Sequence, residues 1–440
     1  MLVDTLRADA LGAYGNPRDL SPTIDAIAAE GVLFERAIAS SPWTQPSMAS
    51  LFSSFNPGVH GVVSYAAAFS ALYGDAEKVA VFDDTFTTLA ESLRAHGYET
   101  AGFVANPFLL EPFGFSQGFE YYDASFAGNR TPGDRVNEAA VQWLRQREHD
   151  GPFFLYLHYM DVHGPYDGNL RDLDALLDEV DRLPAKQPLT VAELDALDYL
   201  DRLPREYHDA ERHARLRPYR EYWVARYEAG VKQVDHYLAE LRRQLDQLGV
   251  WDGAYVIVTS DHGESLCEHG TWDHGLSTFD TELHVPLVLR WPARLQPGAR
   301  YRHRVRLIDL LPTMRDQLGL PPLERAQGRS IAAWIDAPDS GTDLPAFAEA
   351  LSVGPEQKAL YDGGWKLMLY PDHFELFDLE TDPGENEDVA ARRPEIARRM
   401  RERLERQLAE NHRLADDVRV RFEELTPEQI ERLRSLGYLH

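Results

Sequence analysis

The sequence of 440 residues has only one cysteine and no long apolar segment. Because Cys267 has no second cysteine to pair with, an intrachain disulfide is excluded. We expect this side chain to pack in the interior rather than to bind a metal. A membrane-spanning helix needs about 18 or more consecutive apolar residues, and no stretch of the sequence reaches that length. We therefore expect no membrane span.

The amino-terminal end also lacks a signal-peptide pattern. Residues 1–4 instead have the character of the last part of a buried strand. A start site assigned too late would explain such a beginning and would also remove an export signal. The default expectation is a soluble cytoplasmic protein, and the sequence does not indicate its oligomeric state.

Basic residues are scarce: the sequence contains 45 lysines and arginines but 72 aspartates and glutamates, which gives a net charge of −27. Such an acidic surface repels polyanions, so general binding to nucleic acid or to an anionic membrane is not expected. An anionic substrate would have to be attracted locally, by a metal ion or by buried cationic side chains.

Hydrophobic residues make up 44% of the chain, which suffices for a large core. Apolar runs of strand length occur at residues 100–105, 153–158, 254–259 and 285–291. Helical patterns lie between these runs, at residues 85–96, 135–147 and 221–248. Strands that are apolar on both faces and alternate with helices are typical of an α/β sandwich with a mostly parallel central sheet.

We expect two parts, a catalytic domain at residues 1–340 and a smaller α+β subdomain at residues 341–440. Residues 168–220 are rich in Asp, Leu and Arg and indicate a helical insertion in the first part, either a lid or a surface excursion without a role. In the second part, turn signals separate three short strands of an antiparallel sheet, at residues 358–361, 365–370 and 374–379. A charged helix follows at about residues 394–411.

The segment around Thr44 combines a hydroxyl group with a predicted helix start. Thr44 is suited to be the N-cap of a short helix, Pro46 fits its first turn, and the Asn-Pro-Gly sequence at residues 56–58 ends it. The amino end of a helix presents N–H groups and partial positive charge, which suit a tetrahedral anion such as phosphate or sulfate. Thr44 is thus a candidate nucleophile, although an N-cap threonine without a chemical role has the same pattern.

Acidic residues follow predicted strands at their carboxyl ends, where the ligand sites of open α/β sheets lie. Asp4 ends the first apolar run, and Asp261 and His262 follow the strand at residues 254–259. Two carboxylates and one imidazole suit Zn²⁺ or Mn²⁺ and also admit Ca²⁺. An Asp-His pair after a strand can also be an ordinary loop feature.

Further histidines close to these segments favour a shared site over isolated loop features: His163, His269, His274 and His284. We interpret His269 either as a residue that lines the site or as a loop residue that forms hydrogen bonds. Asn106, at the end of the strand at residues 100–105, is a candidate substrate contact, with a plain turn residue as the alternative.

Taken together, these segments resemble the sulfatase branch of the alkaline-phosphatase superfamily. The similar segments are the first metal-binding segment, the nucleophile motif, the second metal-binding segment and two later landmarks, at residues 3–15, 44–51, 259–264, 308–313 and 375–385. They follow the order of the family and span nearly the whole chain. The resemblance implies the alkaline-phosphatase/sulfatase fold and a hydrolase that acts on sulfate or phosphate esters.

The chain departs from the sulfatase pattern at three positions. True sulfatases convert a Cys or Ser to formylglycine, and Thr44 stands at that position and cannot be converted. Met48 replaces the Arg of the motif, and Thr5 replaces one of two paired Asp ligands. A formylglycine hydrate releases sulfate by collapsing to the aldehyde, whereas a threonine ester has to be broken by a second attack at sulfur or phosphorus.

A threonine nucleophile resembles that of the phosphoryl-handling relatives, the lipid A phosphoethanolamine transferases and the lipoteichoic acid synthases. Their membrane anchor is not found here. The resemblance implies that two histidines contact the transferred group, His163 and His274. It also implies one bound divalent ion, Zn²⁺, Mn²⁺ or Ca²⁺, with four ligands: Asp4, Thr44, Asp261 and His262.

The resulting hypothesis is a metal-dependent hydrolase in which Thr44 attacks the ester. The ion and the helix amino end hold the non-bridging oxygens, and His163 or His274 protonates the leaving oxygen. We expect a small-molecule, glycan or lipid ester of the phosphodiester, phosphonate or sulfate class as the substrate. The alternatives are the transfer of a phospho-group to an alcohol and a non-catalytic, sulfatase-like binding protein.

Overall fold

The computed structural model describes residues 1–63, 78–128, 131–148, 150–164, 166, 220–335, 337, 340–352 and 356–435. The predicted helical insertion at residues 168–220 lies outside the described residues, apart from Arg220. Among the helices of the described part, none combines the length and the apolar character needed to cross a membrane.

An eight-stranded sheet has the strand order β11-β2-β10-β7-β1-β6-β4-β5. Its strands, in chain order, are β1 (Leu2–Val3), β2 (Val32–Ile38), β4 (Glu99–Val104), β5 (Tyr121–Asp123), β6 (Phe153–Tyr159), β7 (Val256–Thr259), β10 (His284–Arg290) and β11 (Ala299–Arg306). Neighbouring strands are parallel except at β10, which is antiparallel to both β2 and β7. The predicted α/β architecture with a mostly parallel sheet is confirmed.

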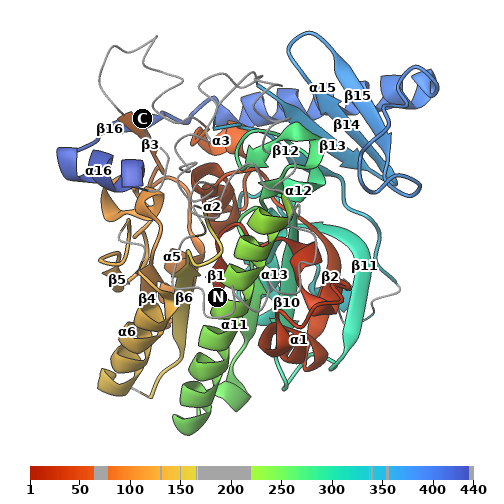
Figure 1. Cartoon of the computed structure of the whole chain (residues 1–440). Helices are drawn as coiled ribbons and strands as arrows, with labels where there is room; N and C mark the ends of the chain where they lie inside the picture. Colours follow the sequence, from red (N-terminus) through yellow and green to blue (C-terminus); the bar gives the residue numbers. More distant parts are fainter. Residues whose placement is uncertain are drawn as a thin grey trace.

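Helices cover both faces of this sheet (Figure 1). One face packs against α1 (Pro22–Ala29), α6 (Gly133–Gln146) and α11 (Arg220–Gln247). The other face packs against α2 (Thr44–Ser53), α5 (Leu89–Arg94) and α13 (Leu310–Gln317). Because the strands are buried on both sides, their sequences are continuous apolar runs rather than alternating ones.

Helix α5 begins later than the predicted start at residue 85. The Thr88 hydroxyl accepts a hydrogen bond from the Glu91 N–H at 3.1 Å, and the Glu91 carboxylate accepts one from the Thr88 N–H at 2.8 Å. This reciprocal capping box satisfies two N–H groups that a helix start leaves open. The helix therefore starts at Leu89.

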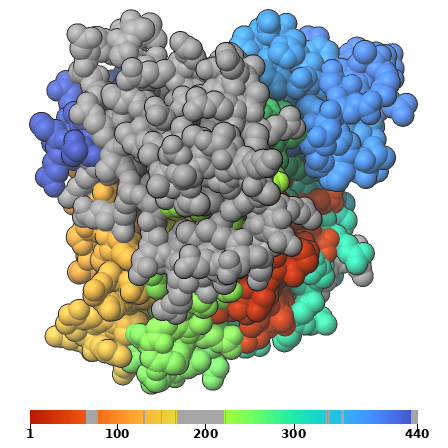
Figure 2. Space-filling view, viewed as in Figure 1, coloured from red at the N-terminus to blue at the C-terminus, as the bar shows by residue number. Residues whose placement is uncertain are grey.

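A four-stranded antiparallel sheet contains β12 (Ala346–Ala348), β13 (Lys358–Asp362), β14 (Trp365–Leu369) and β15 (Phe374–Asp378). The long helix α15 (Pro394–Ala415) packs against this sheet, with Met400 and Leu404 in one apolar cluster with Leu360 and Leu367. Figure 2 shows two separate blue regions, one at the upper right, formed by this sheet with α15, and a darker one at the left edge, formed by α16 (Pro427–Ser435).

The remaining helices and strands are short. They are α3 (Pro57–His60), β3 (Lys78–Val81), β8 (Ser265–Leu266), β9 (Trp272–Asp273), α12 (Asp280–Leu283), α14 (Ala332–Ile335) and β16 (Arg421–Glu424). Buried Lys366 of β14 forms ion pairs with Asp280, at 2.8 Å, and with Glu385. The pair with Asp280 connects the small sheet to α12, which directly precedes β10 of the large sheet.

Candidate active site

The adjacent strands β7, β1, β6 and β4 are parallel, so their carboxyl ends meet at one edge of the sheet. Side chains at these ends converge there, as is typical of open α/β sheets. All of them are buried: Asp261 and His262 after β7, Asp4 after β1, His158 near the end of β6, and Asn106 after β4.

Thr44 is the first residue of α2, and its predicted position as the N-cap is wrong, because Trp43 occupies that position. The Thr44 Oγ1 lies 3.3 Å from His262 Nε2 and accepts a hydrogen bond from Asn106 Nδ2 at 3.2 Å. The hydroxyl therefore faces the strand ends instead of the N–H groups of its own helix. The helix also ends earlier than predicted, at Ser53, because Ser54 adopts a left-handed conformation with φ of 68°.

The structure brings together the residues that the sequence indicates as metal ligands. The Thr44 hydroxyl lies 3.5 Å from Asp4 Oδ2, and the Asn106 amide donates to the same Asp4 oxygen at 2.7 Å. The Nε2 of His262 is 3.6 Å from Asp4 Oδ1 and 3.5 Å from Asp261 Oδ2. Asp4, Thr44, Asp261 and His262 thus surround one point, and Asn106 lies beside them.

Hydrogen bonds between loops hold this arrangement in place. The Ser47 hydroxyl of α2 donates to the carbonyl of Asp261 at 2.6 Å. The Ser260 hydroxyl donates to the carbonyl of His262 at 2.6 Å and accepts a hydrogen bond from the Leu6 N–H at 2.9 Å. The loops after β1 and β7 and the start of α2 are therefore connected directly.

The cluster contains more negative charge than the surrounding protein neutralises. Burial, followed by the charge of Asp261, raises the pKa of Asp4 well above its ordinary value. Asp4 Oδ1 and Asp261 Oδ2 are buried and have no hydrogen-bond partner among the described residues. Unpaired buried carboxylate oxygens are costly, and a bound cation removes that cost. Two carboxylates, an imidazole and a hydroxyl therefore fit a divalent metal ion.

His262 and His163 are neutral, and their neighbours define the tautomer. Burial lowers the pKa of each imidazole to about 3. In each ring Nδ1 faces the carbonyl of the following residue, Gly263 at 2.9 Å and Gly164 at 2.6 Å. A carbonyl oxygen only accepts, so Nδ1 carries the proton and Nε2 carries the lone pair. In His262 this lone pair lies on the nitrogen nearest Thr44, as a metal ligand or a proton acceptor requires.

His274, in contrast, is a buried cation. Its Nδ1 lies 2.8 Å from Asp273 Oδ1 and 3.2 Å from Glu264 Oε1. Burial opposes the charge, but Asp273 and Glu264 together raise the pKa of His274 well above its ordinary value. The ring centroid is 4.6 Å from that of His262 and 4.8 Å from that of His163. A positive charge therefore lies next to the carboxylate cluster, where an anionic ester would need it.

His269 is exposed, and its ring stacks on Phe279 with a centroid distance of 3.6 Å. Its role as a substrate contact stays a prediction. Cys267 is buried in an apolar cluster, in agreement with the expected packing role.

Three further buried residues of the site escape prediction from the sequence: His158, Glu264 and Asp273. In the sequence, His158 is the last residue of an apolar run of strand length. A polar residue in such a run is the signal that could have identified it as a site residue. Asp273 directly precedes His274 and adopts a left-handed conformation with φ of 75°, which is rare for a residue other than glycine. Only the fold shows that Glu264 also reaches His274.

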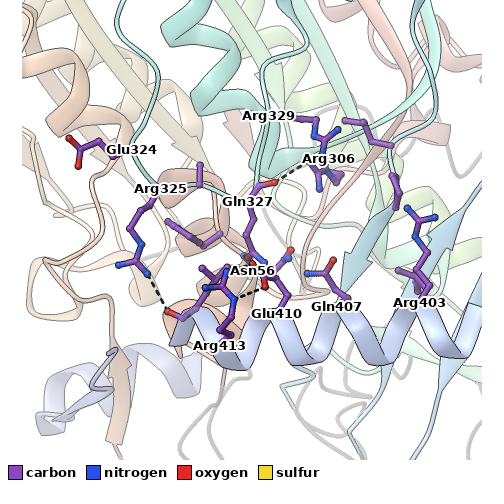
Figure 3. A pocket seen from close by; sticks show the side chains of 16 residues that line it. Asn56, Arg306, Glu324, Arg325, Gln327, Arg329, Arg403, Gln407, Glu410 and Arg413 are labelled. Carbon is purple, nitrogen blue, oxygen red and sulfur yellow. Dashed lines mark hydrogen bonds and ion pairs between the residues drawn. The ribbon is translucent and has the colours of Figure 1, made fainter. Parts of the chain in front are cut away.

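A cavity of about 490 Å³ lies at the opposite end of α2 from Thr44, between the residue 324–329 segment and α15 (Figure 3). A helix of this length separates its two ends by about 15 Å. Three arginines that line the cavity form ion pairs with carboxylates: Arg306 with Asp309, Arg403 with Asp362, and Arg413 with Glu410. The cavity is therefore remote from the candidate active site and much of its positive charge is neutralised.

Comparison with known proteins agrees with this geometry. The sequence matches the model of the sulfatase family over residues 1–320. The chain belongs to the sulfatase family. A second model, for the carboxy-terminal part of N-sulphoglucosamine sulphohydrolase, matches residues 267–413. The chain is thus an ester hydrolase of the sulfatase family, whose members use a divalent metal ion.

Similar sulfatases cover most of the chain. Arylsulfatase K of Xenopus laevis is 26% identical over 430 residues, which span 87% of this chain and 77% of the relative. The N-acetylglucosamine-6-O-sulfatase of Bacteroides thetaiotaomicron is 22% identical, over 98% of this chain and 87% of the relative.

Solved structures share the fold at 20% sequence identity. One is a protein in complex with its substrate D-glucosamine-2-N,6-O-disulfate, with a TM-score of 0.74 over 95% of this chain and 97% of that one. Another is the phosphonate monoester hydrolase of Agrobacterium radiobacter, with a TM-score of 0.67 over 93% of this chain and 95% of that one.

Proposed function

We propose that this sulfatase-family protein hydrolyses a sulfate or phosphate ester with Thr44 as its nucleophile. In this proposal, one divalent ion is bound by Asp4, Thr44, Asp261 and His262. The observation that carries the proposal is the position of the Thr44 hydroxyl, 3.3 Å from the neutral His262 imidazole and 3.5 Å from Asp4. Unpaired carboxylate oxygens on Asp4 and Asp261 support a cation at the same point.

In the first step, the Thr44 hydroxyl loses its proton to solvent, Thr44 Oγ forms a bond to sulfur or phosphorus, and the bond to the leaving ester oxygen breaks. A bound divalent ion supplies positive charge that lowers the pKa of a hydroxyl and offsets the charge of the ester oxygens. Asn106 donates to both Asp4 and Thr44, so it orients the carboxylate and the nucleophile together. The protonated His274 donates its Nε2 proton to the leaving oxygen.

In the second step, a water molecule attacks the same sulfur or phosphorus atom. The bond to Thr44 Oγ breaks, the hydroxyl regains a proton from solvent, and the product is released: inorganic sulfate or phosphate from a monoester, a phosphate monoester from a phosphodiester, or a phosphonate from a phosphonate monoester. His163 is neutral with the lone pair on Nε2, which suits it to accept the proton of the attacking water. The opposite pKa shifts of the two histidines support the proposed roles of His163 as the base and His274 as the acid.

The names of the relatives support particular substrate classes. Arylsulfatase K and the N-acetylglucosamine-6-O-sulfatase support an aryl or sugar sulfate. The phosphonate monoester hydrolase with the same fold supports a phosphonate monoester as the phosphorus-containing counterpart. In a protein with a net charge of −27, the cationic His274 supplies a local attraction for any of these anions.

The decisive experiment compares Thr44→Ala with Thr44→Ser on aryl sulfates, phosphodiesters and phosphonates in the presence of Zn²⁺, Mn²⁺ or Ca²⁺. We expect Thr44→Ala to lower kcat by at least about 10³-fold, because no side chain remains to form the covalent intermediate, and Thr44→Ser to retain activity. Mass spectrometry of the quenched wild-type enzyme should find the sulfuryl or phosphoryl group on Thr44. Undiminished turnover by Thr44→Ala would remove the nucleophile assignment.

The acceptor of the second step separates hydrolysis from transfer. If water is the acceptor, adding a glycan or lipid alcohol to the assay does not change the amount of hydrolysis product that is released. Formation of a new ester at the expense of the hydrolysis product would instead identify a transferase.

A further inference from the structure

His158 presents an unexplained feature next to the proposed metal site. The residue lies in β6 opposite Leu2 of β1, and its side chain is fully buried. Neither ring nitrogen has a hydrogen-bond partner among the described residues. Buried polar groups in native proteins are almost always paired, so this imidazole lacks a partner that the described protein does not supply.

The position of the ring indicates what that partner is. The Nε2 of His158 lies 3.6 Å from Asp4 Oδ2, which is too long for a hydrogen bond. One potential ligand atom each of Asp4, His158 and Asp261 lies within 4.8 Å of the other two. Atoms with this spacing can all contact a single ion, since metal–ligand bonds are about 2.0 to 2.6 Å long.

We propose that His158 is an additional ligand of the metal ion, beside Asp4, Asp261, His262 and Thr44. The inference rests on the proposed function, because it presupposes an ion at this site. It gives the unpaired imidazole a partner and adds a second nitrogen to the donor set. The proposal also predicts metal preference, since Ca²⁺ favours all-oxygen sites whereas two imidazoles favour Zn²⁺ or Mn²⁺.

Pulsed electron paramagnetic resonance of the Mn²⁺-loaded protein counts the imidazole nitrogens that are bound directly to the ion. We expect two coupled nitrogens in the wild type and one in His158→Phe. The control is His60→Gln, because His60 is equally buried but is hydrogen-bonded to Ser50 and the Val62 N–H. This variant should retain both couplings. The wild-type spectrum decides the question even if His158→Phe does not fold.

Calorimetric titration with Zn²⁺, Mn²⁺ and Ca²⁺ provides a second readout. Replacing an outer hydrogen-bonding partner of a ligand typically weakens metal binding by about 10- to 100-fold, so loss of a ligand in His158→Phe should weaken Zn²⁺ binding by about 100-fold or more. A wild-type protein with only one coupled nitrogen would overturn the role of His158 and leave the proposed function intact. A wild-type protein that binds none of the three ions would overturn both.

Discussion

At the scale of single residues, buried histidines in this protein differ in charge because their neighbours differ. His274 Nδ1 faces the carboxylates of Asp273 and Glu264, and its pKa is raised, whereas the pKa of His262, whose Nε2 lies 3.5 Å or more from the nearest carboxylate oxygens, is lowered by burial. His60 is a third case, outside the proposed active site. Its Nδ1 accepts a hydrogen bond from the Val62 N–H at 3.1 Å, and its Nε2 lies 3.0 Å from the Ser50 hydroxyl.

His60 should make the protein less stable as the pH falls. Burial lowers its pKa to about 3, from an ordinary value near 6.5. Between these values the unfolded chain binds more protons than the folded one, so acid favours unfolding. For this residue the expected loss between about pH 7.5 and about pH 6 is roughly 0.8 kcal/mol. The unfolding measurements stay at about pH 6 or above, because a protein with little net charge associates easily and the isoelectric point is near 5.0.

Urea unfolding of the wild type and of His60→Gln at the two pH values measures this contribution. The glutamine cannot titrate but keeps a donor for Ser50, so the variant should lose about 0.8 kcal/mol less than the wild type over the interval. Equal losses in the two proteins would show that His60 can be protonated within the folded state at little cost.

The residues of the site were predictable to the extent that strand ends determine them. Asp4, Asp261 and His262 follow strands, and the carboxyl ends of neighbouring parallel strands share one edge, so their convergence follows from the fold class. His158 lies inside a strand, and it comes close to Asp4 only because β6 lies beside β1 in the sheet. This strand order could not be predicted from the local sequence. Thr44 was assigned to the correct helix end, but its side chain turns toward the strand ends and leaves the capping position to Trp43.

At the scale of secondary structure elements, most strands and the long helix α11 were predicted more closely than the short helices α2 and α5. Apolar runs mark strands that are buried on both faces, and β6 and β10 lie within a residue of their predicted positions. Helix α5 starts four residues later than predicted because the Thr88 capping box fixes Leu89 as its first residue. The antiparallel direction of β10 depends on pairing between distant segments, which no local pattern encodes.

The turn after β7 shows how element packing supports the site. Gly263 directly follows His262, and its N–H donates to the Glu282 carbonyl of α12 at 2.8 Å. A Cβ atom at this position would lie 2.1 Å from the backbone carbonyl oxygen of Thr281. The turn and α12 would have to separate to admit even one methyl group. The glycine thus permits the close contact that positions His262.

Gly263→Ala should therefore displace Asp261 and His262. Overpacking of this kind typically costs about 1–3 kcal/mol of stability, and here it should also weaken metal binding. Gly253→Ala is the matched control, since nothing lies within 4 Å of a Cβ at that position. Calorimetric metal titration and urea unfolding of both variants test the argument. Wild-type metal affinity in Gly263→Ala would show that the turn adapts without moving the site.

At the scale of the whole molecule, two electrostatic effects of cations have to be separated. The net charge of −27 means that any added salt reduces the repulsion among surface carboxylates and so stabilises the fold. A site-bound ion acts differently, because it stabilises only the folded state in which Asp4 and Asp261 lie together. Ionic strength governs the first effect, and the concentration of free metal relative to its dissociation constant governs the second.

Removing the metal should therefore lower the unfolding temperature at constant ionic strength. A ligand present at 100 times its dissociation constant adds about 2.7 kcal/mol to the free energy of unfolding, which corresponds to a shift of several degrees. Differential scanning calorimetry with a chelator, and then with excess Zn²⁺ or Mn²⁺, measures the change, with NaCl matching the ionic strength. In Asp261→Asn the metal-dependent shift should shrink, while the response to NaCl persists. If excess Zn²⁺ or Mn²⁺ raised the unfolding temperature no more than NaCl of the same ionic strength, the carboxylate cluster would hold no ion. The metal-dependent part of the proposed function would then fail.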